Sequence, residues 1–141
     1  AIANALVNPE IKSKLNDSDT LMIIMETASG KQCHINNSRS ATYGYDQRVE
    51  LFGSKGMVIS ENKKPHELKK YNSENVDKSE PYLNFFIERY QEAYMNSISS
   101  FVEAILEKKP VAVGFEDGRK ALLLAETAYK SIKSGRMEDI D

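Results

Sequence analysis

The chain has 141 residues, of which 40% are hydrophobic and 28% are charged, and its formal net charge is −2. This length suits one domain with a core of its own, and the charge argues against nucleic-acid binding, which requires clustered Lys and Arg. The apolar run Leu21 to Met25 is far shorter than the roughly 20 residues needed to cross a bilayer, and Ala1 to Val7 has no basic signal-peptide region. With a single cysteine, the chain is predicted to be cytoplasmic, without an internal disulfide.

The first nine residues suggest an element whose beginning is missing. Ala1 to Val7 are small or apolar apart from Asn4, and Asn8-Pro9 interrupts them. We therefore expect residues 1–141 to form a single domain, as a fragment that begins inside that domain. The alternative is a native terminus from which the initiator Met was removed.

Four strands are predicted in the first half. Leu21 to Met25 are apolar on both faces of an extended chain, so both faces require cover. A turn at residues 28–31 leads into a second strand, whose alternation assigns Cys33 and Ile35 to one face, predicted to face the core. Two further strands flank a Gly53/Gly56 turn. The predicted ranges are Thr20 to Thr27, Gln32 to Ser40, Gln47 to Phe52 and Met57 to Ser60.

Two long helices are predicted in the second half. Residues 61–80 are polar and lysine-rich, which indicates a weak edge strand within long loops. Pro81 suits a first helical turn, and apolar residues then recur every three or four positions to about Lys108. A second helix runs from Phe115 to Ser134 and is closed by Gly135. The predicted fold class is α+β, with a mostly antiparallel open sheet and the two helices packed on one face.

The segment from Tyr43 to Arg48 carries the chemistry of a polyol-binding loop. Tyr43 and Tyr45 flank Gly44, and a polyol offers a ring face for stacking and hydroxyls that need both donors and acceptors. The alternative is structural, in which Gly44 provides a kink and Asp46 pairs with Arg48.

Weaker site candidates lie on both sides of this loop. Asn37 and Arg39 fall on the same face of the predicted strand as Cys33, and this strand leads into the loop. Surface polarity or loop bracing would also explain the two residues. Arg89 interrupts the start of an otherwise apolar helix face, but it would also be explained by pairing with Glu92.

No metal or cofactor motif is found in the sequence. His34 and His66 are not surrounded by a pattern of metal ligands. The chain has no Gly-x-Gly-x-x-Gly, no Gly-x-x-x-x-Gly-Lys and no Gly-x-Ser-x-Gly, and the turn from Gly53 to Gly56 is better explained as a hairpin. We therefore expect neither a metal nor a cofactor to be bound by this chain alone, and no catalytic residue within it.

Two stretches resemble one known family. The first reads Asn-Ser-Arg-Ser-Ala-Thr-Tyr-Gly-Tyr-Asp-Gln-Arg-Val-Glu over residues 37–50, and the second reads Phe-x-x-Arg-Tyr-x-x-Ala-Tyr over residues 86–94. Together with Phe101-Val102 and the stretch from Glu116 to Leu122 in the final helix, they are similar to the C-terminal domain of the glucose-fructose oxidoreductase / inositol dehydrogenase (Gfo/Idh/MocA) family. The likeness covers the chain from about Asp19 onward and points to the inositol 2-dehydrogenase branch.

The resemblance implies a division of labour between two domains. In this family a Rossmann domain, absent from this chain, holds NAD or NADP, while the C-terminal domain shapes the substrate pocket and builds oligomers. The family's catalytic Lys and His lie before the matched region, so the resemblance implies that the fragment alone is inactive. Tyr43 and Tyr45 match positions near the bound polyol. Asp46 and Arg48 are expected to brace the loop, and Asp46 is also a weaker candidate for substrate binding.

The implied parent is an NAD(P)-dependent oxidoreductase that oxidises a cyclic polyol or sugar, with self-association through the open sheet face. One alternative is a stand-alone, non-catalytic association module. Another is a family member that acts on a different sugar, since one fold serves many substrates. The sequence leaves the polyol, the choice between NAD and NADP and the oligomer geometry open.

Overall fold

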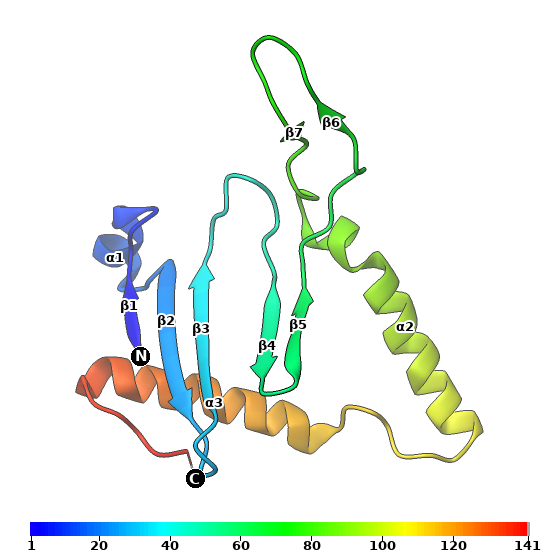
Figure 1. Cartoon of the computed structure of the whole chain (residues 1–141). Coiled ribbons are helices and arrows are strands. Elements are labelled where there is room, and N and C mark those ends of the chain that lie inside the picture. Colours follow the sequence, from blue (N-terminus) through cyan, green and yellow to red (C-terminus); the bar gives the residue numbers. More distant parts are fainter. Residues whose placement is uncertain (141) are drawn as a thin grey trace. The chain divides into compact units, whose positions relative to one another are not determined.

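The structure is a computed structural model that describes residues 1–140. The chain forms two compact units, one made of Ala1–Ser40 with Val111–Asp141 and the other of Ala41–Pro110, and each is described by itself. The described strands pair in three antiparallel sheets, with orders β1-β2-β3, β4-β5 and β6-β7. Helices and antiparallel sheets confirm the predicted α+β class (Figure 1).

The first unit contains a three-stranded antiparallel sheet and two helices. β2 (Thr20–Glu26) lies between β1 (Ile2–Asn4) and β3 (Gln32–Ser38). The predicted hairpin is confirmed, since Ile23 pairs with Ile35 and the turn contains Gly30 at φ +78°. α3 (Phe115–Ser134) contacts β1, and its predicted bounds are confirmed.

The short helix α1 (Pro9–Leu15) was not predicted. Asn8 caps it, because its side chain accepts a 3.1 Å hydrogen bond from the Glu10 amide, and Pro9 occupies the first turn. Asn16 ends it in the left-handed conformation at φ 50°. The sequence contains this signature, an N-cap Asn followed by Pro and Glu, but Asn8-Pro9 was interpreted only as a break.

Asp19 fastens the segment that enters α1. Its carboxylate accepts three backbone hydrogen bonds, from Leu6 (2.8 Å), Val7 (3.0 Å) and Asn8 (2.6 Å), and one from the Thr20 hydroxyl (2.8 Å). The side chain is 3% exposed. Hydrogen bonds to the ionised form, led by the one from Asn8, lower the pKa of Asp19 to about 2.

The apolar strand β2 is covered on one face only within the described residues. Leu21, Ile23 and Met25 are half-buried, whereas Met22 and Ile24 are 56% and 83% exposed. One of the two apolar faces of β2 is therefore uncovered within the described residues. The expectation that both faces require cover stays a prediction.

Cys33 does not lie in a core. The prediction that it points into the core was wrong, since Cys33 is exposed and every residue of β3 is exposed. Alternation along a strand assigns residues to faces, but it does not tell which face is covered.

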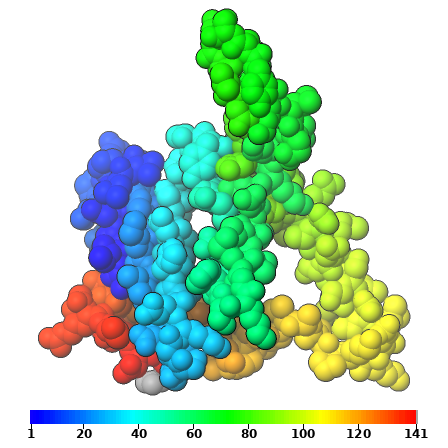
Figure 2. Space-filling model, in the orientation of Figure 1, coloured from blue at the N-terminus to red at the C-terminus, as the bar shows by residue number. Residues whose placement is uncertain are grey.

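The second unit contains two hairpins and one long helix. β4 (Val49–Gly53) and β5 (Gly56–Ser60) form the predicted hairpin, with Gly53 opposite Gly56. β6 (Lys69–Lys70) and β7 (Lys78–Ser79) form a second hairpin where a weak edge strand was predicted, and Figure 2 shows it in green as a narrow projection of its unit.

α2 (Phe86–Leu106) is shorter than predicted. The prediction that it starts at Pro81 was wrong, because the preceding residues are held by backbone hydrogen bonds to other segments: Tyr82 donates to Tyr43, and Leu83 donates to Lys63. None of the described helices has both the length and the apolar composition required of a membrane span.

Candidate functional site

In the second unit, the loop from Tyr43 to Arg48 contains Gly44 in a backbone conformation that favours glycine. This residue has φ +124°, and a Cβ built on it would lie 2.7 Å from the carbonyl oxygen of Tyr82, closer than real Cβ atoms approach. Two backbone hydrogen bonds hold the chain on either side of Gly44. The Tyr82 amide donates to the Tyr43 carbonyl (3.0 Å), and the Tyr45 amide donates to the Leu83 carbonyl (2.9 Å). Glycine is therefore required both by the conformation and by the close approach.

Asp46 is the centre of a hydrogen-bond network in this loop. Its Oδ2 accepts from the Tyr43 hydroxyl (2.5 Å) and from Arg48 Nη2 (2.9 Å). Its Oδ1 accepts from Arg48 Nε (2.8 Å) and from Asn62 Nδ2 (2.6 Å). Asn62 also accepts from the backbone amide of Gln47 (2.7 Å). The carboxylate thus ties the loop to β4 on one side and to the segment after β5 on the other.

The network sets the charge states of its members. The two hydrogen bonds from Arg48, with further ones from Tyr43 and Asn62, lower the pKa of Asp46 to about 2. The hydrogen bond to Asp46 raises the pKa of Tyr43, because removing the phenol proton would place a second negative charge beside the carboxylate. At neutral pH Asp46 is ionised and Tyr43 is neutral.

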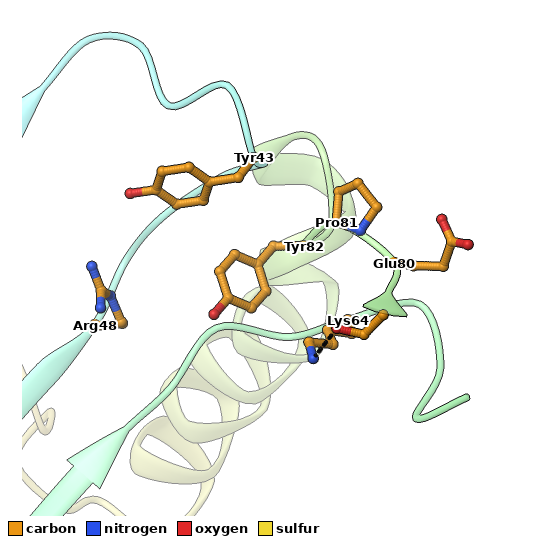
Figure 3. Close-up of a pocket in the computed structure, with 7 residues that line it drawn as sticks. Tyr43, Arg48, Lys64, Glu80, Pro81 and Tyr82 are labelled. Atoms are coloured by element: carbon orange, nitrogen blue, oxygen red, sulfur yellow. Dashed lines mark hydrogen bonds between the residues drawn. The ribbon is translucent and has the colours of Figure 1, made fainter. Parts of the chain in front are cut away.

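A pocket with a volume of about 560 Å³ opens beside the network (Figure 3). Aromatic and aliphatic faces and polar groups line it together, which is usual for small-molecule pockets of 300 to 1,000 Å³. Its lining residues are Tyr43, Arg48, Lys64, Ser79, Glu80, Pro81 and Tyr82. A smaller hollow of about 220 Å³ shares Arg48, Lys64 and Tyr82 with it.

Two pairs of residues define the polar and the aromatic side of this pocket. Lys64 Nζ donates a 2.9 Å hydrogen bond to Ser79 Oγ. The rings of Tyr43 and Tyr82 meet edge to face, with centroids 6.1 Å apart, and Tyr43 remains 49% exposed. The pocket therefore offers ring faces, hydroxyl groups, two cationic groups and the carboxylate of Glu80 to a small ligand.

Tyr45 packs against a different aromatic residue from the one that Tyr43 contacts. Its ring packs edge to face on Tyr90 of α2 at 5.7 Å, and Tyr90 packs in the same way on Tyr94 at 6.1 Å. Desolvation, followed by the contact with Tyr45, raises the pKa of Tyr90. Tyr45 is not among the residues that line the pocket, so the two tyrosines around Gly44 belong to separate clusters.

The comparisons with known proteins identify one family. Residues 3–140 match the Gfo/Idh/MocA model, described as oxidoreductase family, C-terminal alpha/beta domain. The chain belongs to the Gfo/Idh/MocA oxidoreductase family. The resemblance of the two sequence stretches to this C-terminal domain is thereby confirmed, and so is the likeness to inositol dehydrogenases.

Three relatives illustrate the match. The inositol 2-dehydrogenase of Rhizobium meliloti (strain 1021) is 42% identical over 140 residues, which cover 99% of this chain and 42% of that protein. A myo-inositol dehydrogenase from Corynebacterium glutamicum ATCC 13032 has a crystal structure with a TM-score of 0.90 at 37% identity, covering 96% of this chain and 40% of that one. Scyllo-inositol dehydrogenase from Lactobacillus casei shares the fold, with a TM-score of 0.84 at 23% identity over 95% of this chain and 39% of that one.

The chain thus spans about two fifths of the length of the relatives it matches. It is a C-terminal domain of the inositol dehydrogenase type. The predicted site residues of this Gfo/Idh/MocA domain divide between its two units. The unit Ala41–Pro110 contains Tyr43, Tyr45, Asp46 and Arg89, whereas Asn37 and Arg39 belong to the other unit.

The structure assigns local partners to the weaker candidates. Asn37 pairs with Leu21 across the sheet, and Arg39 follows the end of β3, where its backbone amide donates to the Asp19 carbonyl at 2.8 Å. Both side chains are exposed. Whether they reach the substrate stays a prediction.

Arg89 does not pair with Glu92, the carboxylate given as its example partner, whereas a structural role for Arg89 stays open. Glu92 accepts from Lys63 at 2.9 Å instead. The guanidinium carbon of Arg89 lies 5.8 Å from the ring centroid of Tyr90, and Nη2 lies 3.5 Å from the Glu61 carbonyl oxygen. Its Nε is buried and has no hydrogen-bond partner among the described residues. Its role in substrate binding stays a prediction.

Several residues of the network and pocket were not predicted. Asn62, Lys64 and Tyr82 come from segments interpreted as a polar loop and as the first turn of a helix. Each is an ordinary polar or aromatic residue without a periodic pattern, so only the tertiary hydrogen bonds of the loop reveal it.

The turn from Gly53 to Gly56 lacks the geometry of a dinucleotide site, and the described residues contain no cluster of metal ligands. The turn from Gly53 to Gly56 joins two paired strands, whereas a dinucleotide pyrophosphate requires a glycine-rich turn that opens a helix. Over residues 1–140 no group of three or more His, Cys, Asp or Glu side chains converges as metal ligands would.

Proposed function

We propose that this chain is the C-terminal substrate-binding and oligomerisation domain of an NAD-dependent oxidoreductase that oxidises inositol or a related cyclic polyol. The observation that carries the proposal is the 42% identity to an inositol 2-dehydrogenase over 99% of the chain. The fold neighbour from Lactobacillus casei, whose crystal structure contains NAD(H) and scyllo-inositol, agrees with it.

The pocket beside Tyr43 supports a polyol as the ligand. A cyclic polyol carries a hydroxyl on each ring carbon, so it needs several donors and acceptors around a small volume. Tyr43, Tyr82 and Ser79 provide hydroxyls, and Arg48 and Lys64 provide donors, around a volume of about 560 Å³. In this proposal Tyr43 and Tyr45 contact the substrate side, while Asn37, Arg39 and Arg89 are secondary candidates.

The hydride and proton transfers belong to another part of the proposed parent protein. NAD accepts the hydride from the carbinol carbon of the polyol when it is bound. In this proposal the cofactor and the Lys and His that handle the proton belong to the nucleotide-binding half. We therefore propose that the 141-residue chain by itself does not turn over substrate.

The open face of β2 supports self-association. Ile2, Met22 and Ile24 lie on one face of the β1-β2-β3 sheet, because Ile2 pairs with Met22 and Ile24 is two residues further along β2. All three are more than half exposed, Ile24 by 83%. An apolar face of this kind is usually covered by a partner, and in a homo-oligomer the partner is a second copy.

The test uses the full reading frame that encodes this chain. We expect its protein to reduce NAD with myo-inositol or scyllo-inositol, and the 141-residue chain to show no reduction under the same conditions. Tyr43→Phe in the full protein should raise KM for the polyol. A reading frame without a nucleotide-binding half, or a full protein inactive towards all cyclic polyols tried, would favour the association module or a different sugar.

A further inference from the structure

The Asp46 carboxylate has no capacity left for a ligand. An ionised carboxylate offers about four lone-pair sites, and four hydrogen bonds fill them: two on Oδ1, from Arg48 Nε and Asn62, and two on Oδ2, from Tyr43 and Arg48 Nη2. The side chain is also only 17% exposed. Asp46 therefore acts through its neighbours.

The bond to Tyr43 fixes the polarity of that phenol. A tyrosine hydroxyl has one proton and can both donate and accept. Because its proton points at Asp46 Oδ2 over 2.5 Å, the hydroxyl that borders the pocket has only its oxygen lone pairs to offer. The raised pKa of Tyr43 agrees with a proton held in this way.

We infer that Asp46 is a positioning residue that turns Tyr43 into a hydrogen-bond acceptor, so that Tyr43 recognises a hydroxyl group of the ligand and discriminates against a group that can only accept. This inference rests on the proposed polyol function for its ligand, but the Tyr43 and Asp46 part of it is independent of any ligand.

The chain contains a matched control for the network. In the β6-β7 hairpin, Asp77 accepts from the Tyr71 hydroxyl at 3.1 Å and from Lys69 at 2.7 Å, which repeats the arrangement of tyrosine, carboxylate and cation. Neither Tyr71 nor Asp77 lines the pocket. Asp77→Asn therefore removes a similar charge from the same unit without touching Tyr43.

The first experiment follows the tyrosine ζ-carbons of the full chain by NMR, with Tyr43→Phe to assign the resonance. We expect Tyr43 to titrate above the ordinary pKa of 10.0, to move towards that value in Asp46→Asn, and to stay unchanged in Asp77→Asn. If Asp46→Asn does not fold, the wild-type titration decides alone. A Tyr43 that titrates at its ordinary value in the folded wild type would overturn the inference.

The second experiment tests the polarity with ligands, using the protein from the full reading frame. The probes are myo-inositol and its monodeoxyfluoro derivatives, in which fluorine cannot donate. We expect one derivative to bind about 3- to 10-fold more weakly, as one lost hydrogen bond predicts, and this difference to vanish in Tyr43→Phe while it persists in Asp77→Asn. Equal loss in wild type and Tyr43→Phe at every position would contradict the acceptor role.

The two experiments separate the inference from the proposed function. If no cyclitol binds but the Tyr43 resonance still responds to Asp46→Asn, then the substrate proposal fails and the assignment of Asp46 as the residue that orients Tyr43 is supported. If cyclitols bind and Tyr43 is indifferent to Asp46, then the inference fails and the substrate proposal stands.

Discussion

Gly44 and Tyr82 approach each other more closely than any side chain at position 44 would permit. The Cβ of an alanine there would lie 2.7 Å from the Tyr82 carbonyl oxygen and 2.8 Å from its Cβ. Hydrogen bonds from Tyr82 to Tyr43 and from Tyr45 to Leu83 hold the two segments on both sides of the contact. Neither segment can withdraw without breaking one of these bonds.

Gly44→Ala should therefore destabilise the chain by about 3 kcal/mol, combining backbone strain at φ +124° with a steric clash. The measurement is urea unfolding followed by circular dichroism. Gly53→Ala is the control, because the nearest atom to a Cβ at that position is 3.9 Å away. Equal unfolding midpoints for the two variants would show that the loop is not fastened as described.

Gly118→Ala should have the opposite effect. Gly118 lies inside α3, and a Cβ at this position would have open space within 4 Å, so alanine should stabilise the helix by about 0.5 to 1 kcal/mol. Gly135→Ala is the contrasting variant, since Gly135 ends α3 at φ +67° and alanine is strained there. Thermal unfolding should rank them with Gly118→Ala above wild type and Gly135→Ala below it. The reverse order would refute the assignment of the helix end.

Asp19 should make the free energy of unfolding depend on pH in the acid range. Its folded pKa is depressed from 3.8 to about 2, so its contribution to stability is fully present above about pH 4 and is lost as the pH falls towards 2. Asp19→Asn should therefore be less stable than wild type at pH 7, and the difference should shrink between pH 4 and pH 2. The exposed Asp17 provides the control variant, Asp17→Asn. A difference independent of pH would contradict the role of the ionised carboxylate.

Ile24→Lys should weaken self-association. Ile24 is 83% exposed on the open face of β2, so a charge there disturbs any copy bound to this face, by about tenfold or more in affinity. Sedimentation velocity over a concentration series measures the effect. Met137→Lys is the control, because Met137 is also highly exposed but lies after the end of α3. A wild-type chain that stays monomeric at high concentration would remove the basis of the prediction.

The elements that could be predicted are those whose signals are local. α3 begins after Gly114, where Asp117 accepts from the Gly114 amide at 2.8 Å, and ends at Gly135 in the left-handed conformation. Both signals are readable in the sequence. The start of α2 is decided by the backbone hydrogen bonds from Tyr82 to Tyr43 and from Leu83 to Lys63. Tertiary contacts thus override the helix preference of the Pro81 segment.

The site divides in the same way. Tyr43, Tyr45 and Asp46 were identifiable because they stand together on one loop. Asn62 and Tyr82 were not, because nothing near them in sequence indicates that they meet that loop. Lone-pair counting at Asp46, which separates bracing from ligand binding, requires the side-chain geometry and not the residue pattern.

Gly44 also separates two aromatic contacts of the loop. Tyr43 faces Tyr82 and the pocket, while Tyr45 faces Tyr90 on α2, although only one residue lies between them. A substitution on α2 opposite Tyr45 can therefore change the packing of Tyr45 and leave the hydroxyl of Tyr43 in place. Variation at Tyr90 is thus expected to alter how the loop packs on α2 while the Asp46 network remains intact.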